Sequence, residues 1–279
     1  MNEILKFQLI LNELNEVVCR AGRTIMKYYG MKEVKSKIKY DGTPVTEADI
    51  ESERIIISSL KSFTPQIPII SEEQTDERLR TLYDGNDNET STFWLVDPLD
   101  GTEIFMRKED RFTINIGLVQ NSKAVLGMIY FPASDILYSG ISGHQAQVLS
   151  NASRRVKFRP IQIKSRSCGI GDQMIALLNS GISDVSKLDI LLRQVKIFNK
   201  VIGNNSHKLC GVAAGEIEVS TIMRSFEWDT AAGHAILKGA GGNIIDISGK
   251  ELHYGKPAFK NPALIVHGRI SECQTLSHC

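Results

Sequence analysis

Apolar residues near the start of the chain recur at alternating steps of three and four, which is the spacing of one face of an α-helix. This stripe consists of Ile4, Phe7, Leu11, Leu14, Val18, Ala21 and Ile25. It predicts a helix that packs on a core and ends near Gly30, because the repeat is too short for a coiled coil. A second helix is expected from Thr46 or Glu47 to about Ser62. Its inward-facing positions are predicted to be Ile50, Ile55, Ile57 and Leu60.

Short apolar runs between turn residues then predict β-strands. The first two are residues 67–70, which lead through Ser71 to Glu72 and Glu73, and residues 93–96, which lead to Asp97. Residues 84–92 between them have the composition of an exposed loop. Four further runs are typical of an antiparallel meander and cover residues 113–119, 124–131, 136–139 and 146–149.

From about residue 160, strand-like and helix-like segments alternate, which is typical of an α/β arrangement. The expected strands are residues 174–178, 196–201, 217–220 and 243–247, and the expected helices are residues 185–194, 206–215 and 230–239. A polar connection around Arg154, Arg155 and Lys157 marks a boundary. We therefore expect an α+β part over residues 1–157 with an antiparallel sheet and most of the candidate ligands, and an α/β part over residues 158–279.

Composition and charge narrow the range of protein classes to which this chain can belong. The 279 residues include 33 Lys and Arg against 32 Asp and Glu, and the net charge of +1 argues against a nucleic-acid polymer as partner. The sequence has no apolar window of transmembrane length, and acidic residues near its start are unlike a signal peptide. The five cysteines are scattered without a Cys-x-x-Cys spacing. That usage favours a reducing compartment, so we expect a cytoplasmic protein.

The most informative segment is residues 94–102, which read WLVDPLDGT. Asp97 lies at the end of a predicted strand, the following proline fixes a turn, and Asp100 lies on the same bend. Gly101 permits a close approach of the backbone. Both carboxylates and the carbonyl of Leu99 can then face one point. An ordinary Asp-Pro and Asp-Gly turn is the alternative for this segment taken alone.

Other acidic residues stand beside predicted elements, and these are Asp49, Glu72, Glu73 and Asp229. Each could be a surface acid, and Asp229 could be the N-cap of the helix that follows it. If these groups converge with Asp97 and Asp100, like charges about 4 Å apart repel by about 4 kcal/mol per pair at an effective dielectric near 20. The cluster would then require cations, and oxygen ligands select magnesium, manganese or calcium over zinc.

A short helix predicted to begin at Thr102 would point the N–H groups of Gly101 and Thr102 toward the same cluster. Such groups hold phosphate oxygens, so metal-assisted phosphate hydrolysis is the favoured reaction class. The sequence lacks the P-loop, zinc-protease, nucleophile-elbow and dinucleotide-binding motifs. The histidines show no paired metal spacing, so His234 is expected to be an ordinary helix residue.

Four blocks in order along the chain resemble the signature of the inositol monophosphatase superfamily. They are residues 43–49 (TPVTEAD), 71–73 (SEE), 94–105 (WLVDPLDGTEIF) and 228–242 (WDTAAGHAILKGAGG). The last two blocks, together with residues 112–116 (FTINI), are closest to its 3'(2'),5'-bisphosphate nucleotidase (CysQ) branch. The resemblance covers nearly the whole chain. It implies a layered αβαβα sandwich and a magnesium-dependent, lithium-sensitive phosphatase.

Carried over by position, the resemblance assigns two magnesium ions to the acidic cluster. The ligands of one ion would be Glu72, Asp97 and the carbonyl of Leu99. The ligands of the second would be Asp97, Asp100 and Asp229, so that Asp97 bridges the two ions. Bound cations of this kind acidify water and neutralise charge on a phosphoryl group.

The same resemblance implies roles in catalysis and substrate binding. Thr102, hydrogen-bonded to Asp49, would help to deprotonate the attacking water. Glu73 would support the ligands or hold a third, weaker metal. The implied substrate contacts are Glu72, Leu99, Asp100, Gly101, Thr102, Lys208 and Asp229. A nucleotide bisphosphate carries a second phosphate, and Lys208 at the start of a helix is the expected cation for it.

Three segments depart from the branch pattern. Residues 103–105 read EIF where the branch has Lys-Glu-Phe, residues 178–181 read LNSG for Ser-Arg-Ser-His, and residues 204–208 read NNSHK for Gly-Ser-Ser-x-Lys. The catalytic positions are therefore kept while the positions that contact the substrate have changed.

The resulting hypothesis is a phosphomonoesterase of sulfur metabolism that removes the 3'-phosphate of adenosine 3',5'-bisphosphate. The alternatives are an inositol monophosphatase, a fructose-1,6-bisphosphatase, or a non-catalytic relative that binds metal and phosphate. Thr102 and Asp49 argue against the last, since binding alone needs no activation of water. We also expect a homodimer, and the family resemblance implies a peripheral contact with the inner membrane. The sequence assigns no role to Cys273 or Cys279.

Overall fold

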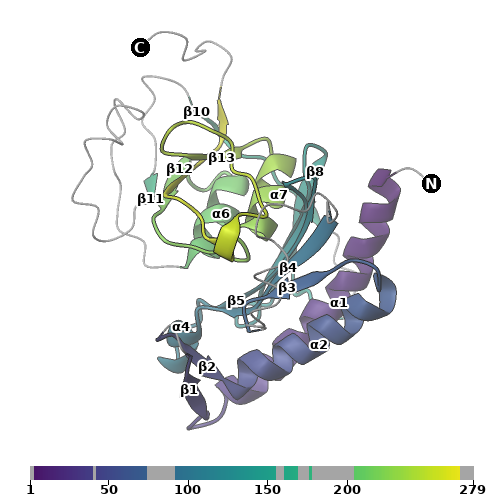
Figure 1. Ribbon diagram of the computed structural model, residues 1–279, viewed down its shortest axis with the longest axis vertical. Coiled ribbons are helices and arrows are strands. Elements are labelled where there is room, and N and C mark those ends of the chain that lie inside the picture. Colours follow the sequence, from purple (N-terminus) through teal and green to yellow (C-terminus); the bar gives the residue numbers. More distant parts are fainter. Residues whose placement is uncertain are drawn as a thin grey trace.

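The computed structural model describes residues 3–39, 42–73, 92–154, 160–168, 176–177 and 204–270. Within these ranges the layers follow the order helix, sheet, helix, sheet, so the chain has a mixed α/β fold (Figure 1). The predicted helix of residues 185–194 and the strand of residues 196–201 lie outside the described residues. The described residues therefore form four layers of the expected αβαβα sandwich.

The larger sheet has seven strands in the order β3-β4-β5-β6-β7-β8-β9. Their bounds are β3 Ile69–Ser71, β4 Thr92–Asp100, β5 Thr113–Gln120, β6 Lys123–Phe131, β7 Ile136–Ile141, β8 Gln145–Ser150 and β9 Ile161–Gln162. β3 pairs parallel with β4, and every later pairing in the sheet is antiparallel. The predicted meander is confirmed. The expected loop before β4 falls largely on residues outside the description.

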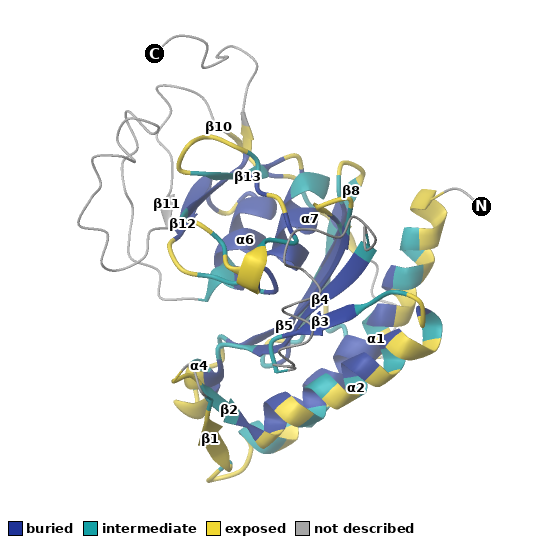
Figure 2. Cartoon of the chain, viewed as in Figure 1, coloured by how far each residue is buried: buried dark blue, intermediate teal, exposed yellow. Residues whose placement is uncertain are grey.

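Helices α1 (Glu3–Tyr29) and α2 (Glu47–Phe63) lie together on one face of this sheet (Figure 1). Most of the predicted stripe of α1 is buried, but Ile4 is 38% exposed because the first turns are open to solvent (Figure 2). In α2, Ile50 is 49% exposed and Ile56 is buried, so that part of the prediction is wrong. The reason is that Asp49 and Ser52, both 0% exposed, take the inward positions at the start of α2.

The opposite face of the sheet is covered by α6 (Asn205–Ala213) and α7 (Ala231–Gly239). α7 is apolar on nearly all sides because it lies between two sheets. It approaches β6 closely, since a Cβ atom on Gly127 would lie 2.0 Å from the Ala232 carbonyl oxygen. The second sheet has the order β11-β12-β14-β13, with bounds β11 Ala176–Leu177, β12 Val219–Ile222, β14 Leu264–His267 and β13 Asn243–Asp246.

Several short elements complete the described chain. They are the hairpin strands β1 Ser36–Ile38 and β2 Pro44–Thr46, helix α4 Thr102–Met106, the parallel pair β10 Ser167–Cys168 and β15 Arg269–Ile270, and the 3₁₀ turn η1 Pro257–Phe259. The predicted boundary between the two parts falls on residues 155–159, outside the described ranges. None of the helices that the structure describes is long and apolar enough to cross a membrane.

Candidate active site

The end of β4 carries the two aspartates that the sequence places on one bend. Asp97 is 1% exposed, and its Oδ1 accepts the N–H of Leu99 at 3.1 Å. The pairing with β5 shifts register between Asp97 and Asp100, so the regular alternation of the strand is broken between the two carboxylates. From α2, the Ser52 hydroxyl donates to the Pro98 carbonyl at 2.7 Å. The segment is therefore a buried bulge and not a surface turn.

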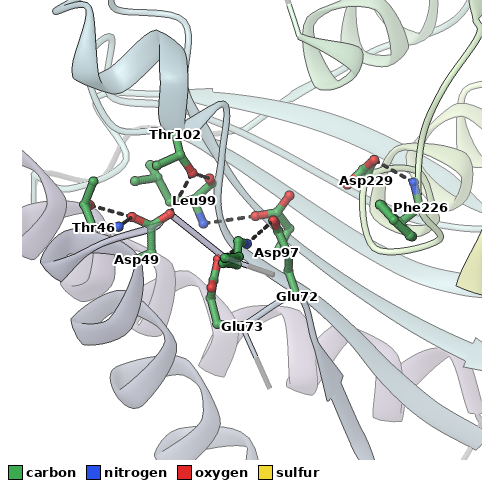
Figure 3. Close-up of polar contacts among 10 residues, drawn as sticks. Thr46, Asp49, Glu72, Glu73, Asp97, Leu99, Thr102, Phe226 and Asp229 are labelled. Carbon is green, nitrogen blue, oxygen red and sulfur yellow. Dashed lines mark hydrogen bonds and ion pairs between the residues drawn. The ribbon is translucent and has the colours of Figure 1, made fainter. Parts of the chain in front are cut away.

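Asp49 faces this bulge from the first turn of α2. Thr46 is the N-cap of the helix, and its N–H donates to Asp49 Oδ2 at 2.8 Å in a capping box. The other oxygen, Oδ1, accepts the Thr102 hydroxyl at 2.8 Å, and the same hydroxyl lies 3.3 Å from the Leu99 carbonyl (Figure 3). Burial raises the pKa of Asp49, and the hydrogen bonds from Thr46 and Thr102 oppose that rise. The contact between Thr102 and Asp49 that the resemblance implies is present.

Asp100 is held from the other side by the start of α6. Its Oδ2 lies 2.9 Å from Ser206 Oγ, 3.3 Å from Thr113 Oγ1 and 3.4 Å from Asn115 Nδ2. Asn204, the N-cap of α6, donates through Nδ2 to the Asp100 carbonyl at 3.4 Å and to Thr113 Oγ1 at 3.3 Å. Ser206, Thr113 and Asn115 are each 0% exposed. A buried polar contact thus joins α6 to the end of β4.

Lys39, which follows β1, forms ion pairs with the two glutamates that follow β3. Its Nζ lies 2.7 Å from Glu72 Oε1 and 2.9 Å from Glu73 Oε1. The N–H of Glu72 donates to the Val96 carbonyl at 3.1 Å, which fixes this glutamate beside β4. Burial raises the pKa of Glu73 to about 7, with the charge of Glu72 adding to the rise and Lys39 opposing it. Although burial disfavours its charge, the glutamates hold the pKa of Lys39 above its ordinary value.

Asp229 lies in the turn before α7 but does not cap that helix. The cap position is Thr230, which makes no side-chain cap bond, and Asp229 Oδ2 instead accepts the N–H of Phe226 at 2.8 Å. The N-cap interpretation is therefore wrong. The turn is anchored by buried Glu227, whose carboxylate accepts two N–H groups of residues 255–256 at 2.8 and 2.9 Å.

The carboxylates of the site lie in one another's electric fields. Burial raises the pKa of Asp97 well above its ordinary value, and the charges of Glu72, Asp100 and Asp229 add to it. The pKa of Asp229 is raised by burial and then by Asp100 and Glu72. Burial raises the pKa of Asp100 to about 6 although Ser206 opposes the rise by hydrogen bonding. A bound cation would relieve this repulsion.

The donor chemistry fits a hard divalent cation, since the candidate ligands are carboxylate oxygens and one carbonyl oxygen of buried or half-buried residues. Figure 3 shows Glu72 and Asp97 close together, with Asp229 standing apart at the start of α7. Among the residues that the structure describes, no three His, Cys, Asp or Glu side chains form a group that could hold a metal ion. The carboxylates interact electrostatically but do not form a closed ligand shell. Lys39 forms an ion pair with Glu72.

Comparisons with known proteins agree with this arrangement. A sequence model of the "Inositol monophosphatase family" matches residues 7–274. The 3'(2'),5'-bisphosphate nucleotidase CysQ of Escherichia coli O6:H1 (strain CFT073) is 31% identical over 265 residues, which cover 92% of this chain and 99% of that protein. The CysQ protein of Buchnera aphidicola subsp. Acyrthosiphon pisum is 34% identical over 248 residues, covering 88% and 87% of the two chains.

The match extends to three-dimensional structure. A crystal structure of CysQ from Bacteroides thetaiotaomicron, described as a bacterial member of the inositol monophosphatase family, superposes with a TM-score of 0.74 at 30% identity. The superposition covers 92% of this chain and 97% of that one. The chain belongs to the inositol monophosphatase family. It is therefore a hydrolase, a phosphatase of a metal-dependent family that acts on small phosphorylated substrates.

Two predicted substrate contacts have particular geometry in this family member. Gly101 has a φ of 90°, a left-handed conformation that favours glycine, and precedes the single short turn of α4. Lys208 is 3% exposed on α6, and its Nζ donates to the Thr221 carbonyl at 3.3 Å. Burial lowers the pKa of Lys208 to about 8, and Asp100 opposes that change. The contact of each residue with a phosphate stays a prediction.

Other residues of the site were not identified from the sequence. Lys39 is one of several lysines in a stretch without a periodic pattern, so nothing local singles it out. Ser206 and its partner Asp100 are 106 positions apart in the chain. Thr113 and Asn115 did carry a signal, because they are polar residues at alternate positions of an otherwise apolar strand.

Proposed function

We propose that this phosphatase hydrolyses the 3'-phosphate of adenosine 3',5'-bisphosphate to give AMP and inorganic phosphate, with magnesium as its cofactor. The observation that carries the proposal is the hydrogen bond from Thr102 to Asp49 beside the buried carboxylate of Asp97. This arrangement combines a proton acceptor with ligands for a cation. The substrate is supported by relatives named 3'(2'),5'-bisphosphate nucleotidase that match nearly the full length of the chain.

The residues that would hold magnesium supply only oxygen atoms. One ion would take Glu72, Asp97 and the Leu99 carbonyl, a second would take Asp97, Asp100 and Asp229, and a third would lie beside Glu73. When bound, magnesium acts as a Lewis acid that acidifies water and neutralises charge on the phosphoryl group. Because the ammonium of Lys39 already contacts Glu72 and Glu73, it competes with any cation at these glutamates.

Thr102 and Asp49 would handle the proton of the attacking water. The Thr102 hydroxyl directs its own proton to Asp49 Oδ1, so a lone pair of Oγ1 is left to accept a proton from water. As that proton arrives, the hydroxyl proton can pass to the carboxylate. The capping box of α2 keeps Asp49 in place, since Thr46 holds the other carboxylate oxygen.

Lys208 is the proposed cation for the second phosphate of the substrate. It stands two positions after Ser206, which contacts Asp100 directly, and the charge of Asp100 acts on its ammonium. Loss of a charged hydrogen bond to one phosphate costs about 1.5–3 kcal/mol, or about ten- to a hundredfold in binding. Lys208→Met should therefore raise KM for adenosine 3',5'-bisphosphate and leave hydrolysis of inositol 1-phosphate nearly unchanged. Equal losses on both substrates would remove Lys208 from the binding site.

The experiment that tests the function is a phosphate-release assay on three substrates: adenosine 3',5'-bisphosphate, inositol 1-phosphate and fructose 1,6-bisphosphate. The highest kcat/KM is expected for the nucleotide, with AMP as its nucleoside product. Activity should require magnesium and be inhibited by lithium. A higher kcat/KM for inositol 1-phosphate would assign the other substrate class, and full turnover in excess EDTA would exclude the metal mechanism.

A further inference from the structure

A compact network of side chains surrounds Asp100 and spans two distant parts of the chain. It comprises Thr113 and Asn115 of β5 and Asn204 and Ser206 of α6 and its N-cap. Ser206 Oγ lies 2.9 Å from Asp100 Oδ2 and 3.0 Å from Asn115 Oδ1. Thr113 Oγ1 lies 3.1 Å from the same Asn115 oxygen. Three donors, from β5 and from α6, thus meet near one oxygen of a proposed metal ligand.

Counting protons gives the direction of these bonds. The hydroxyls of Ser206 and Thr113 have one proton each, and two acceptors compete for them, namely Asp100 Oδ2 and Asn115 Oδ1. The charged acceptor takes the shorter contact, so Ser206 donates to Asp100, and Thr113 donates to the Asn115 carbonyl oxygen. The Asn115 amide then donates to Asp100 Oδ2, and Asn204 donates to Thr113. In this assignment Asp100 accepts two hydrogen bonds, and the Asn115 carbonyl oxygen and the Thr113 hydroxyl accept one each.

The network has a consequence for the carboxylate. Ser206 and Asn115 approach Oδ2 from different elements, so together they fix the rotation of the carboxylate about its Cβ–Cγ bond. Since both bonds end on Oδ2, the other oxygen is left to face a cation. The residues are buried, so water does not substitute readily for a lost hydroxyl.

We propose that Ser206 is a positioning residue that orients Asp100 for magnesium, with Asn115 and Thr113 as its supports. The inference rests on the proposed function, because it concerns one of the proposed ligands. It makes α6, the helix that also carries Lys208, part of the metal centre through a hydrogen bond and not through a ligand of its own. Binding of substrate to α6 and of metal to Asp100 are then coupled.

The test measures magnesium binding to the purified full chain by isothermal titration calorimetry after treatment with EDTA. Residues that orient a metal ligand typically contribute ten- to a hundredfold to metal affinity. Ser206→Ala should therefore weaken magnesium binding by about that factor. Thr113→Val should weaken it by a smaller factor, because Thr113 Oγ1 lies 3.3 Å from Asp100 Oδ2 and its proton is assigned to Asn115. At saturating magnesium, KM for adenosine 3',5'-bisphosphate should return close to the wild-type value.

A matched control separates positioning from general destabilisation. Ser139→Ala also removes a buried hydroxyl, which pairs with Gln147 Nε2 at 3.1 Å in the sheet, away from the carboxylates. It should leave magnesium affinity unchanged although its melting temperature in EDTA falls as much as that of Ser206→Ala. A magnesium affinity of Ser206→Ala within twofold of wild type would overturn this inference and leave the proposed function standing. A wild-type chain that binds no magnesium would instead overturn the proposed function and this inference with it.

Discussion

The substitution Asp100→Asn tests whether the buried charge of Asp100 destabilises the metal-free protein. Asp100 has a pKa of about 6 instead of its ordinary 3.8, chiefly because of burial, with the charge of Glu72 adding to the rise. The folded protein therefore binds the Asp100 proton more tightly than the unfolded chain does. Ionised Asp100 is a net cost to folding, and an asparagine of the same shape removes that cost.

The magnitude follows from the difference between the two pKa values. A change from 3.8 to about 6 corresponds to about 3 kcal/mol at a pH well above both values. The weaker hydrogen bonds that asparagine makes with Ser206 offset about 1 kcal/mol of it. We expect Asp100→Asn to raise the free energy of unfolding in EDTA by about 1–3 kcal/mol at pH 7.

The pH dependence has a definite sign. Below pH 3.8 Asp100 is protonated in both states, so it makes no such contribution there. As pH rises through about 6 the wild type loses stability relative to the variant, and above that the difference is constant. Metal-free wild type should thus show a steeper fall in stability between pH 4 and pH 7 than Asp100→Asn.

Urea unfolding in EDTA at pH 4 and pH 7, followed by the fluorescence of buried Trp94, measures both effects. Asp246→Asn is the control, because hydrogen bonds from Ser248 and Lys250 outweigh the effect of burial and lower the pKa of Asp246. The control should be destabilised at pH 7, opposite in sign to Asp100→Asn. An Asp100→Asn chain that is less stable than wild type at pH 7 would refute the reasoning.

Three further outcomes follow from the same geometry. Asp97→Asn should lower kcat by at least about a thousandfold, or about 4 kcal/mol, while circular dichroism in EDTA shows an intact fold; a chain unfolded in EDTA would make Asp97 structural. Lys39→Met should tighten magnesium binding by calorimetry and lower the melting temperature in EDTA, because Glu72 and Glu73 lose their ion pair; unchanged magnesium affinity would exclude competition. Thr102→Val should lower kcat by about 10²–10⁴-fold with magnesium affinity nearly unchanged, and retention of kcat would exclude the proton relay.

Much of the fold could be predicted from periodicity, because one face of each long element is buried. The meander from β5 to β8 follows directly from apolar runs separated by turns. The predicted inward positions were wrong at the start of α2, because the buried face there is polar. Asp49 occupies the inward position and Ile50 is exposed. The hairpin of β1 and β2 was missed because β1 is exposed at every position and so has no alternation to detect.

The residues of the candidate site also divide into those that local sequence could predict and those that it could not. Asp97 and Asp100 share one bend, so their proximity was predictable from local sequence, as was the approach of Thr102 that follows them. Contacts between distant segments were not predictable from a pattern, and these include the ion pairs of Lys39 and the bond from Ser206 to Asp100. The link between Asp49 and Thr102 came from family resemblance, since 53 positions separate them.

The packing of β4 explains how a repulsive site can persist in a folded chain. The carboxylates do not hold themselves together, because each raises the cost of ionising its neighbours. What holds them is the apolar packing of β4, where Trp94, Leu95 and Val96 are each 0% exposed. That burial contributes stability of a few kcal/mol per large side chain, which offsets the repulsion. The core therefore fixes the ends of the strands, and a bound cation would neutralise the charge left at those ends.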